Sequence, residues 1–292
     1  MTVELVTRST LNIEPALFPF GVLPGSIVEI LGATSAEKSH LITYLMAKFL
    51  TSYPDKRAVY IDTRQSFSLE NFVSILSQLV PNLKNIKKQT MEEWKYHPGL
   101  VPFLERITTL SCYTAEDLLF CFGPKNAGQL ERMLMVAPDY AVVFVDTLDN
   151  FSYCPSLKSV SSSDYPDFVL LLKRSVELTK TPVICVMNNN LRPVKQEEIS
   201  SSYSNEESRD QAPVFSNVTF GKVYFTHSLF LQRLEECKKG FEGGGNSKAG
   251  PKCMLKAHLR SRNNPKMALS AANHWVKFSI LSGILNFEQD TD

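Results

Sequence analysis

The residues with the clearest chemistry lie between Gly32 and Ser39, which read G-A-T-S-A-E-K-S. The pattern G-x-x-x-x-G-K-[ST] defines a phosphate-binding loop. Its backbone N–H groups surround phosphates, its lysine reaches the outer phosphates and its hydroxyl binds Mg²⁺. Gly32, Lys38 and Ser39 fit this pattern, whereas Glu37 occupies the place of the second glycine. Taken alone, the match describes a polar turn before a surface helix about as well as a nucleotide site.

Glu37 weakens the match for two physical reasons. Glycine lets the backbone turn freely and approach the phosphates, whereas glutamate adds a Cβ atom. Its carboxylate also lies beside what would be a polyanion, and at an effective dielectric of about 20 two like charges ~4 Å apart repel by roughly 4 kcal/mol. The sequence therefore predicts a loop of phosphate-binding shape with reduced affinity for nucleotide.

Strand and helix patterns flank this loop and must position it. The apolar run Ile27–Leu31 precedes the loop, and apolar residues at helical spacing follow it from Leu41 to Leu50. Strand, loop and helix in this order form the usual setting of a phosphate-binding loop. Further strand and helix patterns alternate along the chain, at Ala58–Asp62, Leu69–Leu79, Ile107–Leu110, Ala115–Phe122, Gly128–Met135, Ala141–Asp146, Phe168–Leu178 and Pro182–Met187. This alternation predicts an α/β fold with a mostly parallel sheet and helices on both faces.

Two of these strand patterns end in polar residues that could serve a ligand. Asp146 ends the run A-V-V-F-V-D, and a carboxylate in that place binds Mg²⁺ or its waters in nucleotide sites. The alternative is an aspartate that only caps a buried strand. Asn189 follows the run Pro182–Met187, and the carboxyl ends of parallel strands are where open α/β sheets bind ligands.

The chain divides into a short lead, residues 1–20, and a single core, residues 21–292. The lead is too short to form a domain. Within the core, the polar, Ser-rich segment 191–213 is predicted to be a mobile loop, and the Gly-rich segment 239–252 a hairpin turn. After Lys222 three consecutive strand patterns replace the alternation, at Val223–Leu234, Cys253–Leu259 and Trp275–Leu281, which predicts an antiparallel C-terminal hairpin extension of the sheet.

Composition excludes several classes of protein. Of the 292 residues, 43% are hydrophobic and 21% charged, and the formal net charge is +1, as in an ordinary globular protein without a global electrostatic bias. The six cysteines form no C-x-x-C pair, so we expect neither a structural metal nor a disulfide framework. No run reaches the ~18 apolar residues of a membrane span, so we expect no membrane partner.

Although the formal net charge of the whole chain is close to zero, its C-terminal region is basic. Between Lys222 and Lys277 there are eleven Lys or Arg and three Glu. Such a region could contact nucleic acid or an acidic partner, and the alternative is a solvated basic surface. The candidate contact residues are Lys256, Arg260, Arg262 and Lys266.

Taken together, these motifs resemble the RecA-type recombinases, in particular the eukaryotic strand-exchange recombinase and its paralogues. The resemblance rests on P-G-S-I-V-E-I-L-G, V-Y-I-D-T, A-V-V-F-V-D and the strand that ends in Asn, in this order. It extends to K-A-H-L-R-S-R-N-N-P-K, V-K-F-S-I and S-G-I-L near the end of the chain. The opening I-E-P-A-L-F is most similar to the small XRCC-type paralogue. The resemblance implies a RecA-like P-loop core.

The resemblance also implies roles for individual residues. Lys38 and Ser39 match the phosphate and Mg²⁺ positions, and Asp146 matches the metal-associated carboxylate. Active members read I-D-T-E where this chain reads I-D-T-R, so Arg64 stands in place of the catalytic base. Arginine stays protonated and cannot accept a proton from water. Asn189 is the nearest match to the family's polar sensor, which is usually Gln.

The departures at Glu37, Arg64 and Asn189 together argue for a degenerate ATPase site without a catalytic residue. As a hypothesis, Glu37 and Arg64 form an ion pair in the empty pocket. Weak, non-hydrolytic binding of ATP and Mg²⁺ stays open.

The resemblance therefore implies a nuclear, non-catalytic subunit of a heteromeric mediator complex that assists the recombinase filament in homologous recombination and DNA repair. Expected partners are other recombinase paralogues, the filament, and single-stranded or forked DNA reached through the complex. Phe18 and Phe20 would dock onto a neighbouring subunit, or pack on the chain's own sheet. Two alternatives stay open: a DNA-stimulated ATPase completed by a partner subunit, and another P-loop class such as a small-molecule kinase.

Overall fold

The computed structural model of the chain describes most of the residues before 187 and the C-terminal strands. The described ranges are 8–33, 36–84, 86, 90–123, 128–151, 165–187, 225–234, 253–261, 275–281 and 284–287. The predictions for the segments 191–213 and 239–252, and for Asn189, Arg262 and Lys266, lie outside the described residues.

Within these ranges the strands form a single nine-stranded sheet in the order β3-β2-β4-β5-β1-β6-β7-β8-β9. All pairs from β3 to β6 along this order are parallel, and the remaining pairs are antiparallel. The strands are β1 Ile27–Gly32, β2 Arg57–Asp62, β3 Ile107–Ser111, β4 Tyr140–Asp146, β5 Val183–Val186, β6 His227–Arg233, β7 Cys253–Ser261, β8 Trp275–Leu281 and β9 Ile284–Phe287. The predicted α/β class, with a mostly parallel sheet and an antiparallel C-terminal extension, is confirmed.

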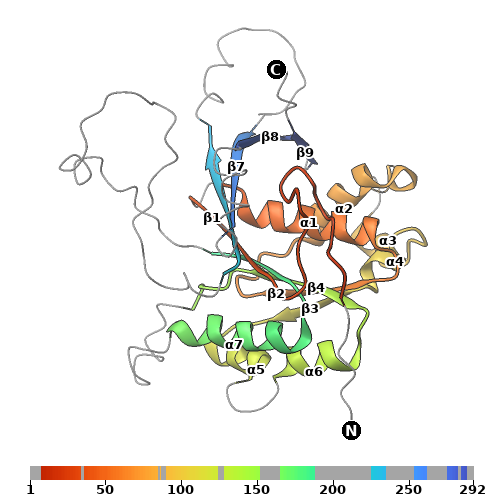
Figure 1. Cartoon of the computed structure of the whole chain (residues 1–292). Coiled ribbons are helices and arrows are strands. Elements are labelled where there is room, and N and C mark those ends of the chain that lie inside the picture. Colours follow the sequence, from red (N-terminus) through yellow and green to blue (C-terminus); the bar gives the residue numbers. More distant parts are fainter. Residues whose placement is uncertain are drawn as a thin grey trace, which may run out of the picture.

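Helices cover both faces of the parallel part of the sheet (Figure 1). Helices α1 to α4 lie on one side, and α5, α6 and α7 lie on the other. The helices are α1 Lys38–Ser52, α2 Leu69–Leu79, α3 Met91–Trp94, α4 Val101–Leu104, α5 Ala115–Phe122, α6 Gln129–Val136 and α7 Tyr165–Thr179, with a 3₁₀ turn, η1, at Pro81–Leu83. Two hydrophobic clusters correspond to the two layers, one under α1 and α2 and one under α5, α6 and α7.

The central strands are apolar on both faces because both faces are covered. Every residue of β1 and of β4 is buried. Continuous apolar runs of this kind are typical of parallel strands between two helical layers. The two strands that carry the candidate site residues are therefore fixed on both sides.

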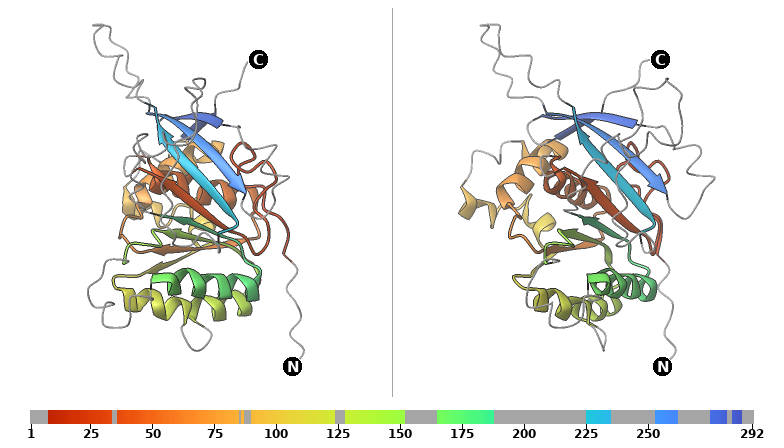
Figure 2. Two further views of the ribbon diagram at one scale, coloured as in Figure 1. Left: turned by 60° about the vertical axis from the view of Figure 1, so that its left-hand side comes forward. Right: turned by 90° about the vertical axis from the view of Figure 1, so that its left-hand side faces the viewer.

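The C-terminal extension differs from the prediction in two details. Strand β6 pairs parallel with β1, so antiparallel pairing begins only between β6 and β7. A fourth strand, β9, follows β8 and pairs Phe278 with Phe287. Figure 2 shows these strands, cyan to blue, leaving the parallel strands on the side away from α5, α6 and α7.

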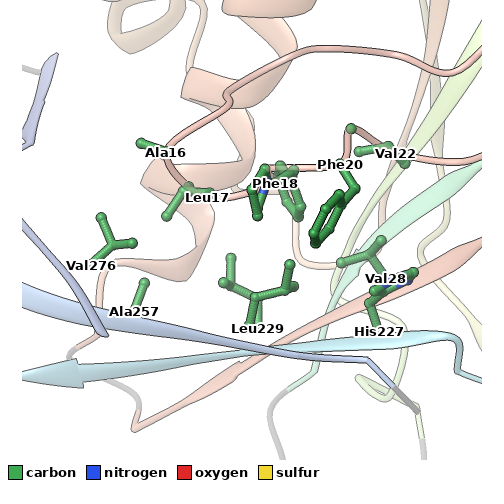
Figure 3. Close-up of a pocket in the computed structure, with 13 residues that line it drawn as sticks. Ala16, Leu17, Phe18, Phe20, Val22, Val28, His227, Leu229, Ala257 and Val276 are labelled. Carbon is green, nitrogen blue, oxygen red and sulfur yellow. The ribbon is translucent and has the colours of Figure 1, made fainter. Parts of the chain in front are cut away.

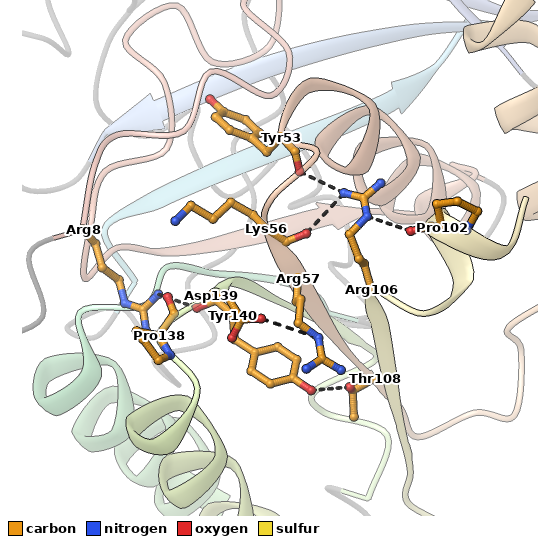
Figure 4. A network of polar contacts seen from close by, with 10 residues as sticks. All are labelled: Arg8, Tyr53, Lys56, Arg57, Pro102, Arg106, Thr108, Pro138, Asp139 and Tyr140. Carbon is orange, nitrogen blue, oxygen red and sulfur yellow. Dashed lines mark hydrogen bonds and ion pairs between the residues drawn. The ribbon is translucent and has the colours of Figure 1, made fainter. Parts of the chain in front are cut away.

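Two arginines, Arg106 and Arg8, donate hydrogen bonds to backbone carbonyls of loops and helix ends (Figure 4). Arg106 donates hydrogen bonds to the carbonyls of Leu50, Tyr53 and Lys56 at 3.0, 2.9 and 3.2 Å, and so caps the end of α1. It also donates to Pro102 O at 2.8 Å.

Arg8 makes similar contacts with the helix layer of α6 and α7. Its guanidinium donates to Thr179 O at 2.9 Å and to Leu134 O at 3.4 Å, and it also donates to Tyr140 O and Pro138 O.

No described helix combines the length and the apolarity that a membrane span requires.

Candidate nucleotide site

Residues with positive φ mark the two described ends of the loop between β1 and α1. Gly32 has a φ of 154°, and a Cβ atom there would lie 2.7 Å from Leu231 O of strand β6. Only glycine fits this position without a shift of the backbone. Lys38 begins α1, so the loop leads directly into a helix N-terminus, as the sequence predicted.

Glu37 takes a left-handed backbone conformation, with φ 52° and ψ 34°. Residues with a Cβ atom enter this region at a cost of roughly 1–2 kcal/mol, whereas glycine enters it freely. The structure therefore keeps the loop geometry for which the sequence pattern requires glycine. The side chain of Glu37 is exposed and makes no capping hydrogen bond to α1.

Lys38 points back onto its own loop. Its Nζ atom donates hydrogen bonds to Gly32 O at 2.8 Å and Ala33 O at 2.9 Å, and the residue is only 5% exposed. Burial lowers the pKa of the Lys38 ammonium, with Arg64 acting in the same direction and Asp149 and Asp146 opposing it. The ammonium that would reach the outer phosphates is thus held by loop carbonyls.

Asp146 accepts hydrogen bonds from four hydroxyl groups. Its Oδ1 atom accepts from Ser39 at 3.2 Å and Thr147 at 2.9 Å. Its Oδ2 atom accepts from Tyr60 at 3.2 Å and Ser66 at 3.0 Å. Asp146 is fully buried, and a carboxylate has about four lone-pair sites. Its hydrogen-bonding capacity is therefore filled by the protein itself.

Tyr60 supports this arrangement from the middle of β2. Burial raises the pKa of its phenol, and the carboxylates of Asp146 and Asp62 raise it further. The phenol therefore stays protonated and donates its hydrogen to Asp146. Tyr60 falls within the predicted strand Ala58–Asp62, and no sequence motif indicated a role for Ser66 or Thr147.

Asp62, at the end of β2, organises the loop that carries Arg64. Its Oδ1 atom accepts from the backbone N–H groups of Arg64 and Ser66 at 3.1 and 3.2 Å, and its Oδ2 atom accepts from that of Phe67 at 3.0 Å. These bonds bring the Ser66 hydroxyl to Asp146. The loop after β2 and the end of β4 thus form one hydrogen-bonded unit.

The hypothesis of an ion pair between Glu37 and Arg64 is wrong for this structure. Both side chains are exposed, and no ion pair among the described residues joins them. Exposed pairs gain little because water screens their attraction. Arg64 instead lies close enough to Lys38 to lower the pKa of its ammonium.

The donor set fits a magnesium nucleotide in type. Ser39 and Asp146 offer the hard oxygen ligands that Mg²⁺ prefers, and Lys38 offers a charge for phosphate. Binding would require Lys38 to leave its loop carbonyls and Asp146 to release a hydroxyl donor. The remaining candidate, Asn189, lies outside the described residues.

The predicted docking residues divide between the protein interior and its surface. Phe18 is 3% exposed and belongs to the core cluster under α1, whereas Phe20 is 51% exposed. Figure 3 shows both rings directed toward the sheet, above Leu229 and near Val28. For Phe18 the structure shows the other alternative, a ring that packs against the chain's own sheet. Docking onto a neighbouring subunit stays a prediction.

The lead segment is anchored along much of its described length. Leu11 and Val22 exchange two backbone hydrogen bonds, at 3.0 and 2.8 Å. Leu11, Ile13 and Leu17 are buried in the same cluster as Phe18. This part of the lead thus packs as part of the core.

Two of the predicted basic contacts, Lys256 and Arg260, lie in strand β7 of the C-terminal extension. Lys256 of β7 stands opposite Gln232 of β6 and Lys277 of β8. The backbone of Arg260 lies in the same strand, opposite Ser228.

The sheet order, the loop after β1 and the aspartate that ends β4 place this chain in the class of RecA-like α/β folds. No protein-family model and no curated protein matches the chain. Among solved structures it is similar to the RadB recombinase, with a TM-score of 0.57 and 16% sequence identity over 97% of this chain and 100% of that chain. Identity of this size shows the fold alone.

Proposed function

We propose that this chain is a recombinase paralogue with a degenerate ATPase site, which serves as a non-catalytic subunit of a heteromeric mediator complex in homologous recombination and DNA repair. The RecA-like fold supports the family level of this proposal. The XRCC-type assignment, nuclear residence and the partners rest on the sequence motifs alone. The complex would join other recombinase paralogues and assist the recombinase filament.

One observation carries the proposal. The four hydroxyl groups that bind Asp146 fill the hydrogen-bonding capacity of its carboxylate. Three of the four bonds come from distant parts of the chain, at Ser39, Tyr60 and Ser66. The position of the catalytic base is held by Arg64, which cannot activate water. The cluster around Asp146 therefore serves as a structural centre that joins α1, β2 and β4.

The second candidate is an ATPase whose site a partner subunit completes. It is favoured by the 3.2 Å contact between Ser39 Oγ and Asp146 Oδ1, which brings the two expected Mg²⁺ ligands together. In this case a neighbour would supply the base that Arg64 replaces.

Measurements of ATP binding and turnover on the purified chain, alone and with its co-purifying partner, separate the two candidates. Under the proposal, turnover is at background in both samples, and a Lys38→Ala variant supports recombination as well as the native chain. Turnover that appears with the partner and disappears in Lys38→Ala would establish the second candidate instead.

A further inference from the structure

Two buried thiols lie side by side at the edge of the sheet. The Sγ atoms of Cys112 and Cys121 are 3.7 Å apart and share a hydrogen bond. Cys112 follows strand β3, and Cys121 lies near the end of helix α5. A disulfide bond has an S–S length of about 2.05 Å, so the two sulfur atoms would approach by roughly 1.6 Å.

A short surface element can supply this movement. Helix α5 has eight residues, and Tyr113 and Phe120, which adjoin the two cysteines in sequence, are 70% and 71% exposed. Strand β3 is the last strand of the sheet order and has a neighbour on one side only. Closure of the sulfur pair thus leaves the central strands in place.

Cys185 shows what a solitary buried thiol looks like in the same protein. It lies in the central strand β5, fully buried, with Sγ 3.5 Å from Val28 O. Burial raises the pKa of its thiol. Among the cysteines whose side chains the structure describes, Cys112 and Cys121 alone face another thiol.

We propose that Cys112 and Cys121 are a redox modification site, which forms an intrachain disulfide bond on reaction with hydrogen peroxide. The Cys121 thiolate attacks a peroxide oxygen, which breaks the O–O bond and yields a sulfenic acid and hydroxide. The Cys112 sulfur then attacks the sulfenic sulfur, forming the S–S bond and breaking the S–O bond. The hydroxide ions take the two thiol protons, so two thiols are oxidised and one peroxide is reduced to two waters.

The hydrogen bond between the thiols sets the order of attack. Either thiol can donate this hydrogen bond. With Cys112 as the donor, the bond stabilises the Cys121 thiolate and lowers the pKa of Cys121, while it raises the pKa of Cys112. The thiolate is the nucleophile in these reactions. Cys121 is therefore the peroxide-reactive sulfur, and Cys112 resolves the intermediate.

The pair is connected to the loop that carries Arg64. The Cys112 N–H donates to Asp62 O at 2.9 Å, and Gln65 Nε2 donates to Cys112 O at 3.3 Å. Disulfide formation would therefore act on the loop beside the nucleotide site. The proposal itself stands apart from the proposed function, because it requires neither nucleotide nor a partner.

Peroxide treatment followed by unfolding, alkylation and peptide mapping tests the proposal. Trypsin cuts after Arg106 and Lys125, so both cysteines lie in one peptide, Ile107–Lys125. In the oxidised sample this peptide is expected to lose two hydrogens and take no alkyl group. The peptide with Cys185 is the internal control and is expected to stay alkylated.

Two variants test the order of attack. With Cys112→Ser, peroxide is expected to leave a sulfenic acid at Cys121 that dimedone traps, whereas Cys121→Ser leaves no trapped product at Cys112. If the Cys112→Ser variant fails to fold, the Cys112→Ala variant is used in its place. The proposal is overturned if both cysteines stay alkylatable after peroxide, if either pairs with another cysteine, or if sulfinic acid forms without a disulfide.

Discussion

At the scale of single residues, the candidate site combines a strained backbone with a saturated carboxylate. Glu37 carries a left-handed backbone that suits glycine, and Asp146 accepts four hydroxyl bonds. The first feature lowers stability, and the second raises it by satisfying a buried charge. Both features can be tested separately.

Replacement of Glu37 by glycine is expected to stabilise the protein. Glu37→Gly removes the left-handed strain and should raise the free energy of unfolding in urea by about 1 kcal/mol. The matched control is Glu37→Ala, which removes the carboxylate but keeps the Cβ atom, and it should bring no such gain. Equal free energies of unfolding for the two variants would show that the Glu37 carboxylate, and not its backbone conformation, destabilises the protein.

Loss of the Asp146 carboxylate is expected to destabilise the protein strongly. Asp146→Ala leaves buried hydroxyl groups without their acceptor, and the expected cost is about 3 kcal/mol in urea unfolding. Ser66→Ala removes one donor only and should cost about 1 kcal/mol. If Asp146→Ala cost no more than Ser66→Ala, the cluster would not be the structural centre described above.

His227 gives the protein a pH dependence in the acidic range. Burial lowers the pKa of its imidazole below the usual 6.5. As pH falls through 6.5 toward the folded-state pKa, the unfolded chain binds a proton that the folded chain does not, so stability falls. His227→Gln should reduce this loss, as followed by thermal unfolding at a series of pH values. An unchanged slope in the variant would assign the dependence to other groups.

At the scale of elements, a side chain from elsewhere in the chain donates hydrogen bonds to the free carbonyl groups at the end of helix α1. Helix α1 has no basic residue in its last turn. Arg106, the residue immediately before β3, supplies a cation that donates to the carbonyls of Leu50 and Tyr53 at the end of α1. Cations near a helix C-terminus are favourable because they meet unsatisfied C=O groups and the negative end of the dipole. A residue far along the chain thus fixes the end of the helix that starts at the phosphate loop.

Arg106→Ala is expected to lower the free energy of unfolding by about 2 kcal/mol, because several carbonyl bonds are lost together. The measurement is urea unfolding followed by far-UV circular dichroism. Arg106→Lys keeps the charge but loses the forked donors, and should recover only part of the loss. Full recovery by lysine would show that charge alone caps α1.

At the scale of the whole molecule, the C-terminal extension is the basic part of the sheet. Strands β6 to β9 contain four Lys or Arg and no Asp or Glu. Lys256 and Lys277 lie directly opposite each other, a pairing that is unfavourable between like charges. Neither forms an ion pair within the described ranges. This face supports the proposed contact with DNA.

Removal of both lysines is expected to weaken DNA binding and to reduce its dependence on salt. If each meets one phosphate, Lys256→Ala with Lys277→Ala should lower the slope of log K against log salt by about 2 on duplex DNA. The control is Arg132→Ala with Arg174→Ala, which removes two exposed cations from the helices α6 and α7. An equal effect of the two pairs would argue for diffuse attraction without a defined face.

Sequence reasoning predicted the alternating strands and helices, the loop that starts α1 and the strand that ends at Asp146. It could do so because apolar periodicity and loop patterns are local. The hydroxyl donors of Asp146 were missed, since Tyr60 and Ser66 lie 86 and 80 residues away in the chain. The burial of Phe18 was left open for the same reason, because local sequence does not show which ring a sheet covers.

The position of β1 in the sheet has a consequence for folding. Its neighbours β5 and β6 come late in the sequence, and Ile27 N–H bonds Thr226 Oγ1 across 199 residues. Contacts between residues this far apart in the sequence raise the contact order of the fold and slow folding, because long loops must close first. During synthesis β1 would stay an open edge until β5 and β6 have left the ribosome, and open edges promote aggregation. Chains truncated before residue 227 should therefore accumulate as insoluble protein.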